Sequence, residues 1–337
     1  MSKVAKHKVN CKCSHADVFL DTLAQLSTEG FSSLNANQLA ERESLQKRAR
    51  AKAFTNSYIF DLIDLESELS KSYWQTYRCS SDILQEGDRA TARYCNQRWC
   101  LVCNRIRTAK MINGYQEPLS KFIDPQFVTL TIVNVPDKEL KSAIESMTNA
   151  IKDIRKNLKK TYGLTLRALR KYECTFSRER KDYHPHFHLI VEGLDVSNKL
   201  VDLWLKRFPT ADRGGQNITA ADSSSLNELC KYFTKVIAKD NDYNAKALDV
   251  MFQAAKGKRT FQPIGLRKFV SEEIEEIQGQ RITIKPPQTE IWCYDRDAYD
   301  WVSADGEILS EYSPSIKDLE VINQSYKTKG NVNIETG

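Results

Sequence analysis

The sequence lacks any long apolar run, and this absence excludes a membrane-spanning protein. No stretch of the 337 residues approaches the roughly 20 apolar residues that a spanning helix needs. The N-terminus, MSKVAKHKVNCKCSH, is charged throughout and has no apolar core of a secretion signal. Hydrophobic residues make up 41% and charged residues 28% of the chain, an ordinary balance for a folded protein. We therefore expect a cytoplasmic protein of about two domains.

Disulfide bonds are also not expected, although the chain has nine cysteines. A reducing compartment keeps thiols free, and clustered cysteines there point to metal binding. Cys79, Cys95, Cys100 and Cys103 fall within one window that contains the run YCNQRWCLVC. A C-x₂-C pair with two further cysteines nearby provides the four soft ligands of a tetrahedral Zn²⁺ site. The alternative is a set of four buried thiols without a metal.

The net charge of +6 is unevenly distributed along the chain. Residues 269–337 contain 14 acidic and 6 basic residues, a balance of −8, so residues 1–268 carry +14. A positive excess of this size is typical of a protein that binds nucleic acid, because phosphates attract it at long range. A lysine-rich surface without a nucleic-acid partner is the alternative reading.

Hydrophobic periodicity predicts an α+β fold. We expect strands at residues 127–135, 166–177, 186–192 and 217–220, and helices at 140–158, from 196 onward and at 223–240. The apolar stripe of the first of these helices should pack on a sheet. The order of elements suits an antiparallel sheet with helices on one face. Residues 17–77 are expected to be mostly helical.

Three of the five histidines lie in the segment YHPHFHLIV. Because strand side chains alternate, His186 and His188 should share one face of a strand while Phe187 points into the core. A hairpin could bring Glu173 of the preceding strand beside them, which would give two imidazoles and a carboxylate for a divalent cation. His184 has the same parity and is a candidate further ligand, although Pro185 can redirect it. Buried polar histidines and a surface glutamate remain the alternative.

The helix expected at 223–240 has an unusual polar face. At about 100° per residue, Glu228, Tyr232, Lys235 and Lys239 lie on one side of it, opposite apolar residues such as Leu229. A tyrosine between a carboxylate and two lysines is poorly placed for packing, so it is a candidate functional residue. An amphipathic surface helix with an incidental tyrosine is the alternative.

Taken together, RWCLVC, FVTLT, HPHFH and the tyrosine helix resemble the HUH endonuclease superfamily, and within it the plasmid rolling-circle replication initiators. The four motifs occur in the order found in that family, from Cys79 to Lys235, over nearly half of the chain. The resemblance implies an RRM/ferredoxin-like HUH fold. We expect a mainly helical region at 1–78, a zinc-binding element at 79–115, the nicking domain at 116–250, and a C-terminal region at 251–337 with a basic loop and an acidic, β-containing tail.

The resemblance also implies a reaction and its partners. Mg²⁺ or Mn²⁺ would be held by His186 and His188, with Glu173 and His184 as further candidate ligands, and Zn²⁺ would be structural. Tyr232 would attack a phosphate of single-stranded or hairpin-extruded origin DNA, which leaves a 5′-phosphotyrosine and a 3′-hydroxyl. Glu228 would activate water or assist a second cleavage when replication ends, and Lys235 would steady the phosphate or the leaving oxygen. A host helicase and polymerase are the expected further partners.

Other functions remain open at this stage. A transposase or relaxase would share the chemistry, although relaxases usually carry the tyrosine near the N-terminus. A zinc-dependent DNA-binding regulator would lack catalysis, and a zinc hydrolase would cleave without covalent attachment. The basic segment 256–269, with Phe261 and Phe269, could grip a single strand or be an ordinary loop.

Overall fold

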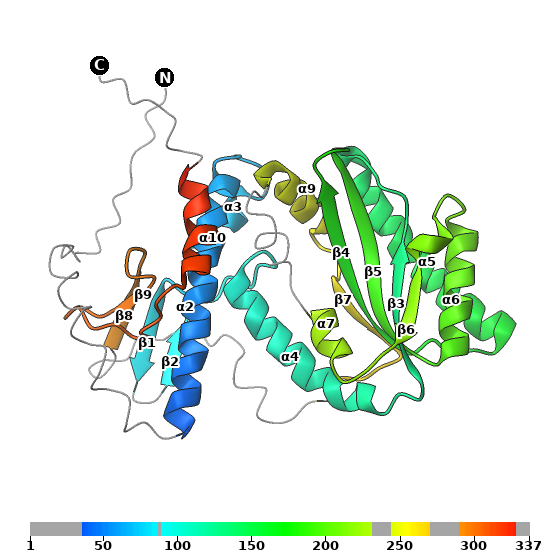
Figure 1. Ribbon diagram of the computed structural model, residues 1–337, viewed down its shortest axis with the longest axis horizontal. Helices are drawn as coiled ribbons and strands as arrows, with labels where there is room; N and C mark the ends of the chain where they lie inside the picture. The colour runs from blue at the N-terminus through cyan, green and yellow to red at the C-terminus, as the bar shows by residue number, and fades with distance from the viewer. Residues whose placement is uncertain (1–35, 87–88, 231–243, 270–289, 328–337) are drawn as a thin grey trace, which may run out of the picture.

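The computed structural model describes residues 36–86, 89–230, 244–269 and 290–327. It confirms an α+β fold in which two antiparallel sheets are combined with helices (Figure 1). The five-stranded sheet has the order β6-β3-β5-β4-β7. Its strands are β3 (Pro125–Thr131), β4 (Ala168–Ser177), β5 (Asp182–Glu192), β6 (Asn217–Ala220) and β7 (Phe261–Ile264).

One face of this sheet packs on α5 (Asp137–Tyr162) and α6 (Leu194–Arg207). The predicted apolar stripe of α5 is buried in full, as Leu140, Ile144, Met147, Ile151, Ile154 and Leu158. Acidic residues occupy the first turn of α5 and lysines its last, which suits the helix dipole. The helix ends at Gly163, whose φ of +67° favours glycine. Phe187 of β5 is fully buried on this face and contacts Trp204 of α6.

The opposite face of the sheet, called here the histidine face, carries His186 and His188. It is partly covered by α4 (Leu101–Ser120) and α7 (Ser225–Cys230), which lie across the sheet from α5 and α6 (Figure 1). The sequence predicted helices on one face only. The difference has a physical reason, because Leu169 and Ile190 also point to the histidine face and need an apolar cover.

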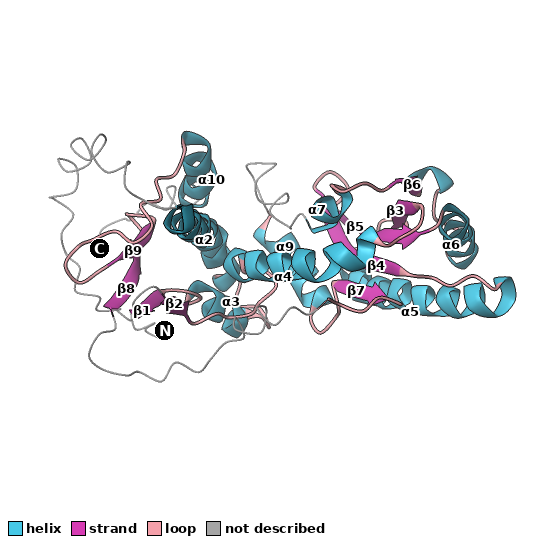
Figure 2. Ribbon diagram, turned by 90° about the horizontal axis from the view of Figure 1, so that it is seen from below, coloured by secondary structure: helices cyan, strands magenta, loops and turns pink. Residues whose placement is uncertain are grey.

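The second sheet joins segments that are far apart in the sequence. Its order is β2-β1-β8-β9, with β1 (Asp82–Glu86), β2 (Arg89–Ala92), β8 (Glu290–Asp295) and β9 (Asp300–Val302). It lies beside α2 (Ala36–Ile63) and α10 (Ile316–Lys327), away from the five-stranded sheet (Figure 2). Arg50 of α2 donates two hydrogen bonds to Asp318 of α10 through Nε and Nη2, at 3.1 and 2.7 Å to Oδ1. The C-terminal region therefore packs on the N-terminal helix.

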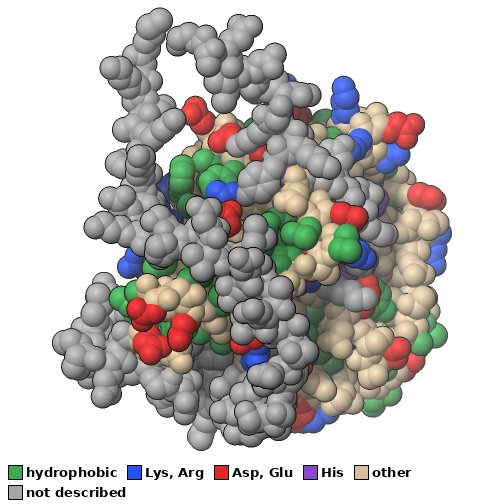
Figure 3. All heavy atoms as spheres, turned by 60° about the vertical axis from the view of Figure 1, so that its left-hand side comes forward, with side chains coloured by type: hydrophobic (Ala, Val, Ile, Leu, Met, Phe, Trp, Pro, Cys, Tyr) green, Lys and Arg blue, Asp and Glu red, His purple; other side chains and the backbone are tan. Residues whose placement is uncertain are grey.

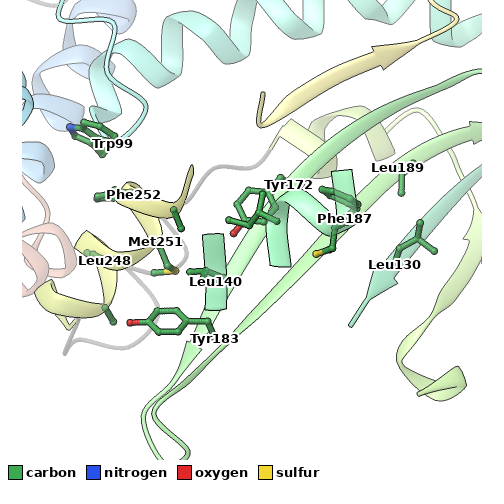
Figure 4. Close-up of a cluster of buried hydrophobic side chains, with 14 of the residues drawn as sticks. Trp99, Leu130, Leu140, Tyr172, Tyr183, Phe187, Leu189, Leu248, Met251 and Phe252 are labelled. Carbon is green, nitrogen blue, oxygen red and sulfur yellow. The ribbon is translucent and has the colours of Figure 1, made fainter. Parts of the chain in front are cut away.

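The helix α9 (Ala245–Ala255) connects the two parts of the molecule. Phe252 of α9 packs on Trp99, with ring centroids 5.2 Å apart, and on Tyr73 of α3 (Ser70–Tyr77). Figure 4 shows Leu248 and Met251 of the same helix on the side of Tyr183 and Leu140. These side chains belong to one continuous hydrophobic cluster that runs from α2 to β5.

Several boundaries differ from those predicted. The strand expected at 127–135 ends at Thr131, because the next residues form only an isolated bridge between Val135 and Tyr183. The strand expected at 186–192 begins earlier, at Asp182, and lengthens the hairpin with β4. Strand β7 comes from the segment 256–269, so part of the predicted basic loop completes the five-stranded sheet. None of the described helices is long and apolar enough to cross a membrane.

Candidate active site and metal centres

Strand pairing brings three of the predicted residues together on the histidine face. In the β4–β5 hairpin Glu173 is the cross-strand partner of His186, and His188 follows two residues later on the same face. Oε2 of Glu173 lies 3.5 Å from Nε2 of His186 and 3.6 Å from Nε2 of His188. The three residues each offer a ligand atom, and these atoms lie within 4.8 Å of one another. The cluster has the donor set that a divalent cation takes in proteins.

The second ring nitrogen of each histidine is already engaged. Nδ1 of His186 donates to the backbone oxygen of His184 at 3.0 Å, so in the neutral ring Nε2 carries the lone pair. Nδ1 of His188 lies 3.1 Å from the hydroxyl of Thr129 on β3. Such partners orient imidazoles for metal binding and fix the tautomer. Thr129 could not be predicted from the local sequence pattern, because its position depends on the pairing of β3 with β5.

Lys171 is a further residue that the sequence analysis missed. It is only 4% exposed and forms an ion pair with Oε1 of Glu173, the oxygen that does not face the histidines. Burial raises the pKa of Glu173, but hydrogen bonding with His186 and the charge of Lys171 outweigh it and lower that pKa to about 2. The carboxylate is therefore charged at neutral pH and its orientation is fixed from both sides. The alternation Lys171–Glu173 along a strand is the signal that could have indicated it.

His184 does not join this cluster. Its Nδ1 lies 2.7 Å from the side-chain oxygen of Asn134, and burial lowers its pKa. Its ring centroid is 5.4 Å from that of His186. Among the described residues, the group of ligand atoms around Glu173 does not include it.

The helix that precedes Tyr232 docks on the histidine face. Leu229 and Cys230 of α7 are buried against Leu169 and Ile190, and Ile190 lies two residues beyond His188 on the same face. Burial raises the pKa of Cys230 to about 11, and the nearby charge of Lys171 partly opposes this rise.

Glu228 of α7 is half-buried. Tyr232 and Lys235 lie outside the described residues. Cys230, the last residue of α7, thus lies on the histidine face and precedes Tyr232 by two residues in the sequence.

The histidine cluster is shielded but reachable from solvent. The side chain of His186 is 10% exposed and that of His188 is 23% exposed. In the view of Figure 3 the visible histidine atoms form only small areas, and acidic and basic side chains are scattered around them.

The four cysteines predicted to bind zinc, Cys79, Cys95, Cys100 and Cys103, also lie close together. Cys100 caps α4 and accepts from the backbone N–H of Cys103, while Cys79 follows α3 and Cys95 follows β2. The sulfur of Cys103 lies 3.5 Å from that of Cys79 and 3.6 Å from that of Cys95. A tetrahedron with Zn–S distances of about 2.3 Å has sulfurs about 3.8 Å apart. The cluster could therefore hold a metal ion of this kind.

The surroundings of the cysteines suit charged sulfurs. Backbone N–H groups of Asn96 and Gln97 donate to the sulfurs of Cys103 and Cys95, at 3.2 and 3.4 Å. Lys52 of α2 is 1% exposed and donates to the carbonyl of Cys79 at 2.8 Å. Burial lowers the pKa of Lys52 to about 8, although the neighbouring cysteines favour its charged form. A buried cation beside four thiols offsets the negative charge that metal binding creates.

Comparison with known proteins gives consistent matches. A family model described as Replication protein matches residues 87–192, which include two of the β-strands of the cluster. A "Protein rep" of Staphylococcus aureus is 32% identical over 173 residues, 45% of this chain and 72% of that protein. A "Protein rep" of Streptococcus pneumoniae serotype 2 is 31% identical over 106 residues, 30% of this chain but only 33% of that protein. No solved structure matches the chain.

Proposed function

Because the chain belongs to the Rep family of replication proteins, we propose that it initiates plasmid rolling-circle replication by nicking and rejoining one strand of origin DNA. The nucleophile is Tyr232, and the cation site is Glu173, His186 and His188. The observation that carries the proposal is the shared face of the sheet. The cluster and the docked end of α7 both lie on it, and Tyr232 follows α7 by two residues.

The donor set favours a hard divalent cation such as Mg²⁺ or Mn²⁺ held by the two Nε2 atoms and Oε2 of Glu173. When bound, this cation supplies charge that polarises the scissile phosphate, which a phenol with a pKa of about 10 requires to react at neutral pH. The ion pair with Lys171 keeps Glu173 in the carboxylate form. The hydrogen bond from Nδ1 of His186 to the backbone oxygen of His184 keeps Nε2 of that ring available. The hydroxyl of Thr129 accepts from Nδ1 of His188 when Nε2 of His188 holds the cation.

The reaction exchanges one phosphodiester for another. The phenolic oxygen of Tyr232 bonds to phosphorus, its proton passes to solvent, and the bond from phosphorus to the 3′-oxygen breaks. The 3′-oxygen takes a proton and becomes a 3′-hydroxyl that a polymerase can extend. Attack by a 3′-hydroxyl on the phosphotyrosine reverses these steps and rejoins the strand. Lys235 steadies the phosphate, and Glu228 assists the second cleavage at the end of replication.

The cysteine cluster has a structural role in this proposal. Zn²⁺ held by Cys79, Cys95, Cys100 and Cys103 fixes the start of α4, whose later turns help to cover the histidine face. The site is closed by four protein ligands, which leaves no open position for a substrate. A host helicase and a host polymerase are the further proposed partners of the protein.

The test is covalent capture of DNA. The protein is incubated with Mn²⁺ and single-stranded oligonucleotides that tile the origin region of the replicon that encodes it. A denaturing gel should then show a protein–DNA adduct. Tyr232→Phe should abolish the adduct, and Tyr162→Phe, at an exposed tyrosine of α5, is the matched control that should form it normally. His186→Ala should abolish the adduct and retain most of the DNA affinity.

Three results would contradict the proposal. Cleavage by the wild-type protein without an adduct would indicate a hydrolase that activates water. An adduct that persists in Tyr232→Phe would place the nucleophile elsewhere. Origin binding without any cleavage, by protein that is folded and loaded with metal, would support a non-catalytic regulator instead.

A further inference from the structure

The two sides of the histidine face are covered differently. On the β4 side, Leu169 and Ile190 lie under α7 and Tyr115 of α4. On the β6 side, the cross-strand row that contains His188 continues through Thr129 to Asn217. Asn217 is exposed, as is Thr219 two residues further along the same edge strand. The apolar cluster reaches Phe127 on β3, whereas the edge strand β6 beyond it presents exposed polar side chains on this face.

A rigid turn borders the polar side next to the cation site. The short helix η1 (Arg213–Gly215) packs against the end of β3. The side chain of Gln216 accepts from the backbone N–H of Thr131 at 2.8 Å and donates to the hydroxyl of Thr131 at 3.0 Å. Thr131 is the cross-strand partner of His186. The turn is therefore fixed one strand away from a residue of the candidate site.

Glycine is required at the closest approach of this turn. A Cβ atom on Gly215 would lie 2.9 Å from Oγ1 of Thr131, closer than real Cβ contacts permit. The carboxylate of Asp212 is engaged within the turn, where it accepts from the backbone N–H of Gly214 at 3.0 Å. Arg213 is exposed on this turn, whose backbone is held by the hydrogen bonds of Asp212 and Gln216.

The chemistry of this border fits a single nucleic-acid strand. An exposed guanidinium binds a backbone phosphate with two parallel hydrogen bonds. The neighbouring Asn217 and Thr219 are uncharged donors and acceptors for sugar and base edges, and they do not repel a polyanion. A duplex would present both strands to a face that α4 and α7 already cover on one side, so a single strand is the better fit.

We propose that the single strand reaches the cation site across β6 and β3, and that Arg213 binds a backbone phosphate beside the scissile one. This inference rests on the proposed function and adds a DNA contact that lies outside the histidine, tyrosine and cysteine motifs. Arg213 positions the strand and takes no part in bond making or breaking.

The test measures affinity against salt concentration. Fluorescence anisotropy is recorded with a labelled single-stranded oligonucleotide of mixed sequence, about 30 nucleotides long, for Arg213→Ala, Arg213→Lys and Arg155→Ala. Arg155 is exposed on α5, on the other face of the sheet, and is the matched control. Arg213→Ala should weaken binding about fivefold and lower the slope of log K against log salt by about 0.7, the value of one phosphate contact. Arg213→Lys should retain most of the slope, and Arg155→Ala should match wild type.

An Arg213→Ala variant with wild-type affinity and slope would overturn the inference. An equal loss in Arg155→Ala would also overturn it, because general charge would then explain the effect. Covalent adduct formation is measured on the same proteins. If wild type forms the adduct while Arg213→Ala binds normally, only the inference fails. If wild type forms no adduct, the proposed function fails regardless of the binding result.

Discussion

Replacing Thr129 by valine tests how the proposed cation site is built. For Nε2 of His188 to bind a cation, the proton of the neutral ring must be on Nδ1, where it can be donated to the hydroxyl of Thr129 at 3.1 Å. Thr129→Val keeps the shape of the side chain and removes this acceptor. The ring then loses a partner that holds its orientation and its tautomer.

The expected magnitude follows from the burial of the site. A hydrogen bond of this kind contributes about 1–1.5 kcal/mol, and loss of such an outer partner lowers metal affinity about 10- to 100-fold. The side chain of His188 is 23% exposed, so water can replace part of the contact. We therefore expect a loss of about tenfold, which corresponds to about 1.4 kcal/mol.

The assay is Mn²⁺ binding, by calorimetry or by electron paramagnetic resonance of free Mn²⁺. Thr219→Val is the matched control, because Thr219 is an exposed threonine of the neighbouring edge strand and pairs with Phe127 instead of His188. Thr219→Val should bind Mn²⁺ like wild type. Equal Mn²⁺ affinity of Thr129→Val and wild type, in folded protein, would refute the reasoning.

Three further predictions concern stability. Cys100→Ser, or removal of metal by a chelator, should lower the melting temperature measured by calorimetry by several degrees. Elemental analysis should then find one zinc fewer per chain than in wild type. An unchanged melting temperature would contradict a structural metal. Ile190→Ala should cost about 2–4 kcal/mol in urea unfolding, because it opens a cavity beneath α7, and a cost below about 1 kcal/mol would show that α7 is not packed there. In metal-free protein the pKa of Glu173 is about 2, against an ordinary value of 4.5. After allowance for its partial exposure, this shift stabilises the fold by about 2 kcal/mol above pH 4.5. The stabilisation is lost as the pH falls towards 2. Between about pH 5 and pH 2, the unfolding free energy of Glu173→Gln should therefore depend less on pH than that of wild type. Identical curves for the two proteins would contradict the lowered pKa of Glu173.

The histidine cluster was largely predictable, because it depends on local geometry. Alternation along a strand places His186 and His188 on one face, and a hairpin between neighbouring strands brings Glu173 opposite them. The buried stripe of α5 was predictable for the same reason, since helical periodicity needs no knowledge of distant residues.

Residues that depend on distant pairing were not predictable in this way. The contact of Thr129 with His188 requires the register of β3 against β5, across a separation of 59 residues. The joining of β8 to β1 and of β7 to β4 likewise depends on partners that the local pattern does not specify. The cover of Ile190 by α7 was missed because a strand pattern does not indicate that both faces of a sheet are packed.

The central claim is that the phenol of Tyr232 acts at the cation site of Glu173, His186 and His188. Its most direct test is mass spectrometry of the trypsin-digested DNA adduct formed with Mn²⁺. Cleavage after Lys231 and Lys235 isolates the peptide YFTK, in which Tyr232 is the one tyrosine. The account predicts nucleotides attached to this peptide through a phosphotyrosine bond, and none on it for His186→Ala. Attachment of the DNA to any other peptide would contradict it.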